Sequence, residues 1–208
     1  MKKIAAIIPA YNEAKHIKPV LKTLKSTNII DEIIVIDDCS KDNTKEIVKK
    51  LKIKYLRNKT NKGKAYSMNK GVKKTDADII FFCDADIIGL TPDIVKNIIK
   101  PVLNNKYIMF IGGRSNTLQK YKFNIKLSGE RALKRKLWEK TPEFFKKRYR
   151  IEMGLNHYAK KYGKYNYKIF KHKQRIIEKK YNLIKGIILR IWMDIDILSA
   201  YIYIKLKD

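Results

Sequence analysis

The sequence predicts an α/β fold in which helices flank a mostly parallel β-sheet. In the first half of the chain, short apolar runs rich in β-branched residues alternate with segments whose apolar residues recur at helical spacing. Acidic or amide residues directly follow several of the apolar runs, where parallel strands would end together. With 208 residues, 45% of them hydrophobic, the chain is long enough for one domain with a substantial core.

Strand and helix alternate from the N-terminus to about residue 111. The strands are expected at residues 4–8, 32–36, 52–56, 78–83 and 107–111. The helices are expected at residues 13–26, from a cap at Ser40 or Asp42 to about residue 50, at residues 63–73, and from Thr91 as cap with Pro92 in the first helical position. This order predicts parallel neighbouring strands and helices on both faces of the sheet.

The pattern changes after the fifth predicted strand. Helices are expected at residues 130–140 and 150–162, and a strand is expected at residues 165–170. No linker or repeat divides the chain. We therefore expect one domain at residues 1–172, followed by an amphipathic helical extension at residues 173–208.

The C-terminal extension is strongly apolar, and its apolar residues recur at helical spacing. Its apolar stretch is interrupted by charged residues at Lys185, Arg190, Asp194 and Asp196. These charges argue against a transmembrane helix. We expect the extension to pack on the domain or on the partner subunit of a homodimer, and peripheral contact with a membrane surface is the alternative.

The chain carries a formal net charge of +28. Much of the excess lies in residues 120–180, which contain 21 Lys and Arg against five Glu. A lysine-rich proteome is one explanation, and the other is a basic surface that faces nucleotide phosphates, an anionic acceptor or a membrane. Cys39 and Cys83 show neither a metal-site spacing nor a disulfide framework, and no signal peptide is evident. We therefore expect a cytoplasmic location, at the inner face of the membrane if the acceptor is a lipid.

Two aspartates one residue apart, Asp84 and Asp86, follow the apolar run at residues 78–83. Two ionised carboxylates so close together repel each other and are costly to desolvate. A divalent cation would remove both problems, and oxygen ligands suit Mg²⁺ or Mn²⁺, which in turn hold a diphosphate. Ligands of open α/β sheets bind beyond the carboxyl ends of strands, so we predict a metal site here, with a solvated loop as the alternative.

Three further motifs lie at expected strand ends or helix starts. They are Pro-Ala-Tyr-Asn-Glu at residues 9–13, Asp-Asp-Cys-Ser-Lys-Asp at residues 37–42 and Asn-Lys-Gly-Lys-Ala at residues 61–65. The adjacent acids Asp37 and Asp38 can accept hydrogen bonds from a base and from ribose hydroxyls, whereas Asp42 is better explained as a helix cap. In the third motif, glycine permits close backbone approach and Lys64 adds a cation at a helix N-terminus, which suits a phosphate.

In this order, the four motifs resemble the signatures of family-2 glycosyltransferases with the GT-A fold, a Rossmann-like α/β fold. The resemblance covers roughly residues 4–170, and it implies a UDP- or GDP-sugar donor with Mn²⁺ or Mg²⁺ as cofactor. It also implies that Asp38 contacts the base, that Asp84 contacts the ribose or the metal region, and that Asp86 binds the metal. Pro9, Tyr11 and Glu13 would line the nucleoside pocket.

The later part of the chain is similar to two narrower groups. The segment Ser-Gly-Glu-Arg-Ala at residues 128–132 resembles part of the polyprenyl-phosphate sugar synthases. Together with Ile151-Glu152 and Leu155-Asn156, it is also similar to enzymes that glycosylate phosphoglycerate. Both groups imply an anionic acceptor, either a polyprenyl phosphate or a phosphorylated small acid.

The same relatives suggest catalytic and metal-binding roles in the second half of the chain. They place a late histidine near the metal, which corresponds to His172; a solvated histidine at a strand end is the alternative. The acid pair that supplies the base in many inverting members is not evident, so Glu130 or Glu152 would take that role. Arg131, like Lys64, would add positive charge near a phosphate.

A non-catalytic basic module that binds nucleic acid is the alternative function. Abundant Lys and Arg with 13 tyrosines are compatible with such a module. Acids at successive strand ends would repel nucleic-acid phosphates, so nucleic acid is not an expected partner.

Overall fold

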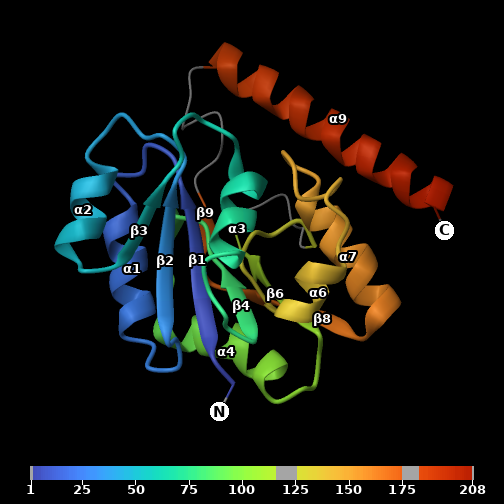
Figure 1. Cartoon of the computed structure of the whole chain (residues 1–208), viewed down its shortest axis with the longest axis horizontal. Helices are drawn as coiled ribbons and strands as arrows, with labels where there is room; N and C mark the ends of the chain where they lie inside the picture. Colours follow the sequence, from blue (N-terminus) through green and yellow to red (C-terminus); the bar gives the residue numbers. More distant parts are fainter. Residues whose placement is uncertain (1, 116–125, 175–182, 208) are drawn as a thin grey trace.

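A computed structural model describes residues 2–115, 126–174 and 183–207. Figure 1 shows a central sheet with helices on both faces and a long C-terminal helix across one end. The elements up to residue 114 are β1 (Ile4–Ala10), α1 (Ile17–Lys25), β2 (Glu32–Asp37), α2 (Thr44–Lys50), β3 (Lys54–Arg57), α3 (Lys64–Val72), β4 (Ile79–Phe82), β5 (Ile87–Ile88), α4 (Pro92–Leu103) and β6 (Met109–Arg114). The later elements are β7 (Arg131–Lys134), α6 (Arg135–Lys140), α7 (Ile151–Tyr162), β8 (Tyr165–Phe170), β9 (Lys173–Gln174) and α9 (Leu183–Lys207).

The main sheet has the strand order β3-β2-β1-β4-β7-β6-β8. Strands β1 to β4 pair in parallel, and β6 pairs in parallel with β8. Strand β7 is antiparallel to both of its neighbours, β4 and β6. The predicted mostly parallel α/β sheet is therefore confirmed, with one reversed strand in its middle.

Period-two alternation along β1 divides the core between the two faces of the sheet. Ile4, Ala6 and Ile8 pack against apolar residues of α1 and α4 on one face. Ala5 and Ile7 pack against apolar residues of α3, α6 and α7 on the other. All five β1 side chains are almost fully buried, as expected for a central strand covered on both faces.

The helix predicted at residues 130–140 is wrong in its first part. Residues Arg131–Lys134 form β7, and α6 begins only at Arg135. Ala132 and Leu133 point to opposite faces of the sheet and join separate core clusters, a period-two placement that sheet pairing imposes. Long-range pairing with β4 and β6 overrides the helical preference of Ala, Leu and Lys.

The first strand extends beyond its predicted end at residue 8, so Pro9 lies inside β1 opposite Ile36. The β4 ladder reaches only as far as Ile7, so at Pro9 the strand has a neighbour on one side alone. A proline, which has no N–H to donate, is tolerated at such an edge position.

The helix starts agree only in part with the prediction. Thr91 caps α4 as predicted, because its hydroxyl accepts a hydrogen bond from Ile94 N. Helix α2 begins at Thr44, whose backbone N–H donates to Asp42 Oδ1 at 3.1 Å, so Asp42 supports the helix start from two residues away. Helix α1 starts only at Ile17, later than the predicted start at residue 13.

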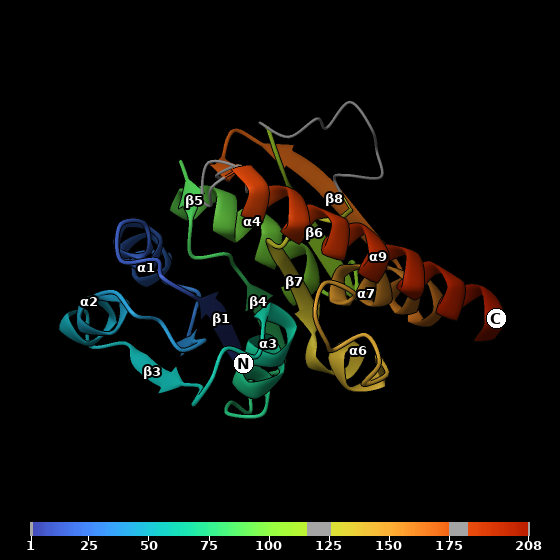
Figure 2. The same ribbon diagram turned by 90° about the horizontal axis from the view of Figure 1, so that it is seen from above.

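A second, two-stranded sheet pairs β5 with β9, opposing Ile87 to Gln174. Pairing with β5 thus joins Lys173 and Gln174 to the folded body, and the division of the chain after residue 172 stays a prediction. Helix α9 then crosses the end of the molecule that lies opposite the N-terminus (Figures 1 and 2). Of the helices in the described ranges, none is sufficiently long and apolar to cross a membrane.

Candidate active site

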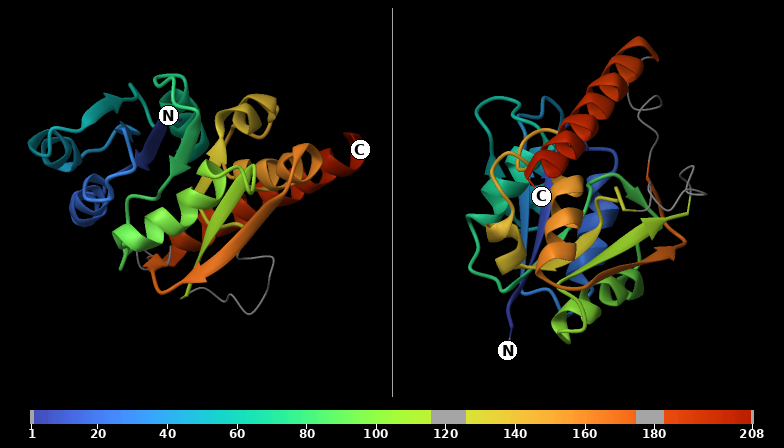
Figure 3. Two further views of the ribbon diagram at one scale, coloured as in Figure 1. Left: turned by 90° about the horizontal axis from the view of Figure 1, so that it is seen from below. Right: turned by 90° about the vertical axis from the view of Figure 1, so that its right-hand side faces the viewer.

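The polar residues of the predicted motifs gather along one rim of the main sheet. Strands β1, β2, β4 and β6 share one direction, so their carboxyl ends lie at the same rim. Strand β7 runs the other way and therefore begins there, which places Arg131 opposite Phe82 and Ile111. Figure 3 shows the sheet from two further sides, with β6 and β8 side by side.

Four hydrogen bonds of 2.8–2.9 Å connect the loop after β1 with the loop after β2. They join Asn12 N to Ser40 Oγ, Glu13 N to Thr44 Oγ1, Ala14 N to Asp42 Oδ2, and Lys41 N to Asn12 Oδ1. Asn12 has a left-handed φ of 54°, a conformation that asparagine tolerates. The two loops thus form one rigid edge, with Glu13 buried and Tyr11 half-buried.

Asp38 is buried at the end of β2 and organises the loop before α3. Its carboxylate accepts hydrogen bonds from Lys62 N at 2.8 Å, Gly63 N at 2.7 Å and Asn58 Nδ2 at 2.7 Å. Gly63 has φ +88°, which an L-side chain rarely adopts. Asp38 therefore fixes the turn that leads into Lys64.

Its neighbour Asp37 is fully buried and accepts hydrogen bonds from Ser40 N and from the Tyr55 hydroxyl. Burial and the Asp37 carboxylate together raise the pKa of Tyr55 to about 12. Asp37 thus stabilises the loop after β2 and its contact with β3.

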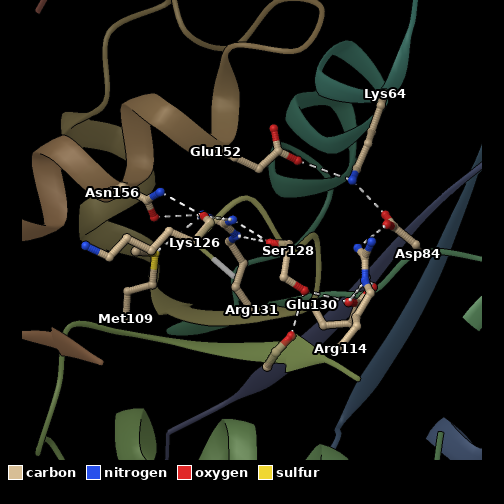
Figure 4. A network of polar contacts seen from close by, with 11 residues as sticks. Lys64, Asp84, Met109, Arg114, Lys126, Ser128, Glu130, Arg131, Glu152 and Asn156 are labelled. Carbon is tan, nitrogen blue, oxygen red and sulfur yellow. Dashed lines mark hydrogen bonds and ion pairs between the residues drawn. The ribbon is translucent and has the colours of Figure 1, made fainter. Parts of the chain in front are cut away.

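Asp84 lies between two cations at the end of β4 (Figure 4). Its Oδ1 is 2.7 Å from Lys64 Nζ, and its Oδ2 is 3.0 Å from Arg114 Nη2. Lys64 also contacts Glu152 at 3.3 Å, across the gap to the first turn of α7. Burial alone would lower the pKa of Lys64, but Asp84 and Glu152 raise it above its ordinary value.

The backbone at Gly129 passes directly beside this ion pair. A Cβ atom there would lie 2.6 Å from Asp84 Oδ2 and 2.7 Å from Lys64 Nζ. A side chain would have to push the pair apart, so glycine permits the close approach.

Arg114 continues the network from Asp84 to Glu130. Its Nε is 2.6 Å from Glu130 Oε2, and both residues are buried. Burial would lower the pKa of Arg114, yet Glu130, Asp84 and Asp86 raise it. Burial would likewise raise the pKa of Glu130, but Arg114 and His172 hold it well below its usual range. The pair is therefore charged on both sides.

His172 closes the rim after β8. The side chain is fully buried, and its Nε2 lies 3.6 Å from Glu130 Oε2. Among the described residues, neither ring nitrogen has a hydrogen-bond partner. A buried imidazole without hydrogen bonds is unusual and suits a role as a ligand.

Arg131 lies under the rim, fully buried. Its guanidinium donates to the carbonyls of Ser128 and Lys126 and, at 3.3 Å, to Asn156 Oδ1. Burial lowers its pKa from the ordinary value. Arg131 therefore ties the segment before β7 to α7 instead of presenting its charge to a ligand (Figure 4).

The predicted metal ligands have suitable chemistry but are not assembled as a set. Across residues 2–115, 126–174 and 183–207, no three His, Cys, Asp or Glu side chains group closely enough to hold a metal ion. Both oxygens of Asp84 contact cations, and Asp86 is buried two residues away. The His172 imidazole lies 3.6 Å from Glu130 and makes no hydrogen bond within the described residues. Carboxylate oxygen and imidazole nitrogen are donors that Mn²⁺ accepts, so Asp84, Asp86 and His172 each suit the ion by their chemistry.

Three site residues were missed by the sequence analysis: Arg114, Ser128 and Asn58. Ser128 Oγ lies 2.6 Å from Gly112 O and 2.9 Å from Glu130 Oε2, so its hydroxyl can donate to either. The signal for Arg114 was its position, directly after Gly112-Gly113 at the end of a predicted strand. Its two acidic partners are 30 and 16 residues away, which no local pattern reveals.

A mostly parallel sheet with an ordered, charged rim at its carboxyl ends defines an open α/β fold of the kind that binds ligands at that rim. Residues 5–184 match the model of glycosyl transferase family 2, and the chain belongs to this family. The chain is 36% identical over 141 residues to a UDP-N-acetylglucosamine–dolichyl-phosphate N-acetylglucosaminyltransferase of Methanococcus voltae. That match covers 58% of the chain and 55% of the relative, so the chain spans about half of it.

Other similar proteins agree on family and fold. A dolichol-phosphate mannosyltransferase of Pyrococcus furiosus is 29% identical over 118 residues, which is 54% of this chain and 33% of that protein. Glucosyl-3-phosphoglycerate synthase of Mycobacterium tuberculosis, solved with Mn²⁺, UDP and phosphoglyceric acid, superposes with a TM-score of 0.80 at 21% identity. The superposition covers 96% of this chain and 78% of that one, and confirms the predicted GT-A fold.

Proposed function

We propose that this chain transfers a sugar from a nucleotide-diphosphate sugar to an anionic acceptor. The observation that carries the proposal is the continuous rim network. It runs from Asp38 through the start of α3 to Lys64, and from there through Asp84 and Arg114 to Glu130 and His172. A network of alternating charge can exchange its internal partners for a diphosphate and a metal without leaving a buried charge unpaired.

The donor would bind where the loops after β1 and β2 are joined. Pro9, Tyr11 and Glu13 would line the nucleoside site, and Asp38 would shape it through the loop at residues 58–63 as well as offer its remaining lone pair to the base. Lys64 begins α3, so its ammonium and the helix N-terminus both favour the diphosphate. The donor is a UDP- or GDP-sugar; the mycobacterial neighbour was solved with UDP.

The proposed cofactor is Mn²⁺ or Mg²⁺, with which the structural neighbours were crystallised. Asp84, Asp86 and His172 would hold it, and Lys64 would pair with the diphosphate. When bound, the ion neutralises charge that develops on the diphosphate leaving group.

Of the two candidate bases, Glu152 is better suited than Glu130. Glu130 is held by Arg114 at 2.6 Å and is fully buried, so its lone pairs are already engaged. Among the described residues, Glu152 forms an ion pair with Lys64 at 3.3 Å, and it lies in the first turn of α7 beside the site. We assign Glu152 to proton transfer at the acceptor, Glu130 to holding Arg114, and Arg131 to positioning the segment at residues 126–130.

The acceptor would be a polyprenyl phosphate or a phosphorylated small acid, the classes named for the dolichyl-phosphate relatives and for the phosphoglycerate neighbour. A non-catalytic nucleic-acid module would not need this acidic rim, and the family match argues against it.

A screen of UDP- and GDP-sugars tests the proposal. The melting temperature should rise with one donor in the presence of Mn²⁺, since a ligand of the folded state alone stabilises it. That donor should then be consumed when an anionic acceptor is added. If no nucleotide sugar changes the melting temperature, or if oligonucleotides bind with steep salt dependence and no donor is turned over, the proposal fails.

A further inference from the structure

Helix α9 presents an uncovered apolar face. Nine of its large apolar side chains are 46–80% exposed: Ile187, Ile188, Ile191, Trp192, Ile195, Leu198, Tyr201, Ile202 and Leu206. Elsewhere in the described ranges, the exposed large apolar residues are scattered singly over different elements: Tyr66, Ile88, Tyr162 and Ile169. A contiguous apolar patch of this kind marks an interaction surface.

The opposite face of α9 is firmly attached to the body, so this orientation is fixed. Asp196 is 2% exposed and forms ion pairs with Arg148 at 3.2 Å and with Arg150 at 3.3 Å. Tyr203 stacks on Phe144 with ring centroids 4.3 Å apart. Rotating the helix to hide the apolar face would move Asp196 and Tyr203 away from their partners. It would therefore break the ion pairs of the buried Asp196.

Basic side chains are exposed along the helix that carries the apolar face. The Arg148 guanidinium lies 4.7 Å from the ring of Trp192, and Arg190, Lys205 and Lys207 are exposed along α9. Asp194 is the one exposed acid among the described α9 residues, since Asp196 is buried. A second copy of a chain with net charge +28 would be repelled, whereas an anionic surface would be attracted.

The face has the chemistry of a helix that lies in a lipid–water interface. Such helices combine a broad apolar stripe with flanking Lys and Arg, and Trp and Tyr favour the headgroup level. Spanning is not an option for the described helices. We infer that α9 lies on an anionic lipid surface.

This placement brings the candidate active site to the same surface. Figures 1 and 2 show α9 at the end of the molecule where the parallel strands end, beside α7. Arg150, the ion-pair partner of Asp196, directly precedes α7. Glu152, in the first turn of α7, contacts Lys64 at the rim. If the proposed function holds, an active site at a lipid surface favours a polyprenyl phosphate over a soluble phosphorylated acid as the acceptor.

Trp192 is a natural reporter of this docking. The chain has two tryptophans, and Trp138 is 2% exposed, so an emission shift on adding vesicles reports Trp192, which is 46% exposed. We expect a blue shift with phosphatidylcholine vesicles that contain phosphatidylglycerol, and quenching by bromine-labelled lipid. Absence of both would overturn the inference.

A charge-neutral pair of variants separates insertion from simple attraction of a basic protein. Ile191→Ser/Ile195→Ser alters side chains that are 54% and 49% exposed, and the control Ile88→Ser/Ile169→Ser alters side chains that are 53% and 49% exposed on other elements. At about 0.5 M salt, where exposed charges are screened, the α9 variant should bind vesicles at least about tenfold more weakly than wild type, and the control should match wild type. Equal vesicle binding by the α9 variant and wild type would overturn the inference.

Sedimentation without lipid tests the other occupant of the face. A dimer that the α9 variant breaks, together with vesicle binding that the variant leaves unchanged, would assign the face to a second copy and overturn the inference. The proposed function can fail separately. If no nucleotide sugar raises the melting temperature while vesicle binding still depends on α9, the transferase activity is rejected and the membrane docking of α9 is retained. Transfer to a soluble phosphorylated acid but not to a polyprenyl phosphate in vesicles would overturn the lipid acceptor.

Discussion

The ammonium of Lys64 lies 2.7 Å from Oδ1 of Asp84 and connects the start of α3 with the end of β4. The two residues belong to motifs 20 positions apart, one suited to a phosphate and the other to a metal. Their contact means that each motif neutralises the other until a charged ligand takes the place of one partner.

Replacing Lys64 with Met tests this exchange. The variant should lose most nucleotide-sugar affinity, because a cation at the helix N-terminus is removed, while Arg114 still pairs with Asp84. We expect stability to fall by about 1–2 kcal/mol, since Lys64 is only partly buried. Titration calorimetry and urea unfolding measure the two effects. The control Lys64→Arg should keep more of the stability than of the donor affinity. Full donor affinity in Lys64→Met would show that Lys64 does not bind the donor.

Asp86→Asn should abolish the metal-dependent part of donor binding. Asparagine keeps the size of the side chain but offers a neutral oxygen, which binds a divalent ion far less well. The melting temperature with donor should then no longer depend on Mn²⁺. The exposed Asp93→Asn is the matched control, and an unchanged response to Mn²⁺ in the Asp86 variant would contradict the proposed ligand.

Arg114→Met should destabilise the protein in a pH-dependent way. In the wild type, the pKa of Glu130 is held below its usual range, so this pair stabilises the fold above about pH 4.5 and loses its effect as the pH falls through the depressed pKa. Without Arg114, the Glu130 carboxylate would be buried without its cation, so the variant protein is more stable when Glu130 is protonated.

The free-energy difference between wild type and this variant should therefore be about 3–5 kcal/mol at pH 7 and should shrink below about pH 4.5. Urea unfolding across this range measures the difference. Arg114→Lys, which keeps the charge, should lose less at pH 7. A difference that does not change with pH would show that the loss comes from packing alone.

Asp196→Asn should loosen α9. The substitution leaves Arg148 and Arg150 without their shared carboxylate, and we expect a loss of about 2 kcal/mol with faster hydrogen exchange in α9. The neighbouring, exposed Asp194→Asn should change stability by less than about 0.5 kcal/mol. Similar hydrogen exchange in both variants would show that Asp196 does not anchor the helix.

Much of the fold follows from local pattern. The apolar run at residues 78–83 could be recognised as a buried strand, and Thr91-Pro92 as a helix start, because both signals lie within a few residues. The antiparallel β7 could not, since residues 131–134 become a strand only when β4 and β6 are already beside them. Local helix preference and long-range pairing competed there, and pairing prevailed.

The sequence by itself determined which acids follow which strands, and therefore that Asp38, Asp84 and Asp86 lie at one rim, because parallel strands end together. Only the tertiary structure decided what each side chain does there. It directed Asp38 to the turn at Gly63, Arg131 to backbone carbonyls and Arg114 to Asp84 and Glu130, and it left one face of α9 uncovered. The physical reason is that ion pairs and burial depend on distances between residues far apart in the chain, which periodicity and spacing do not specify.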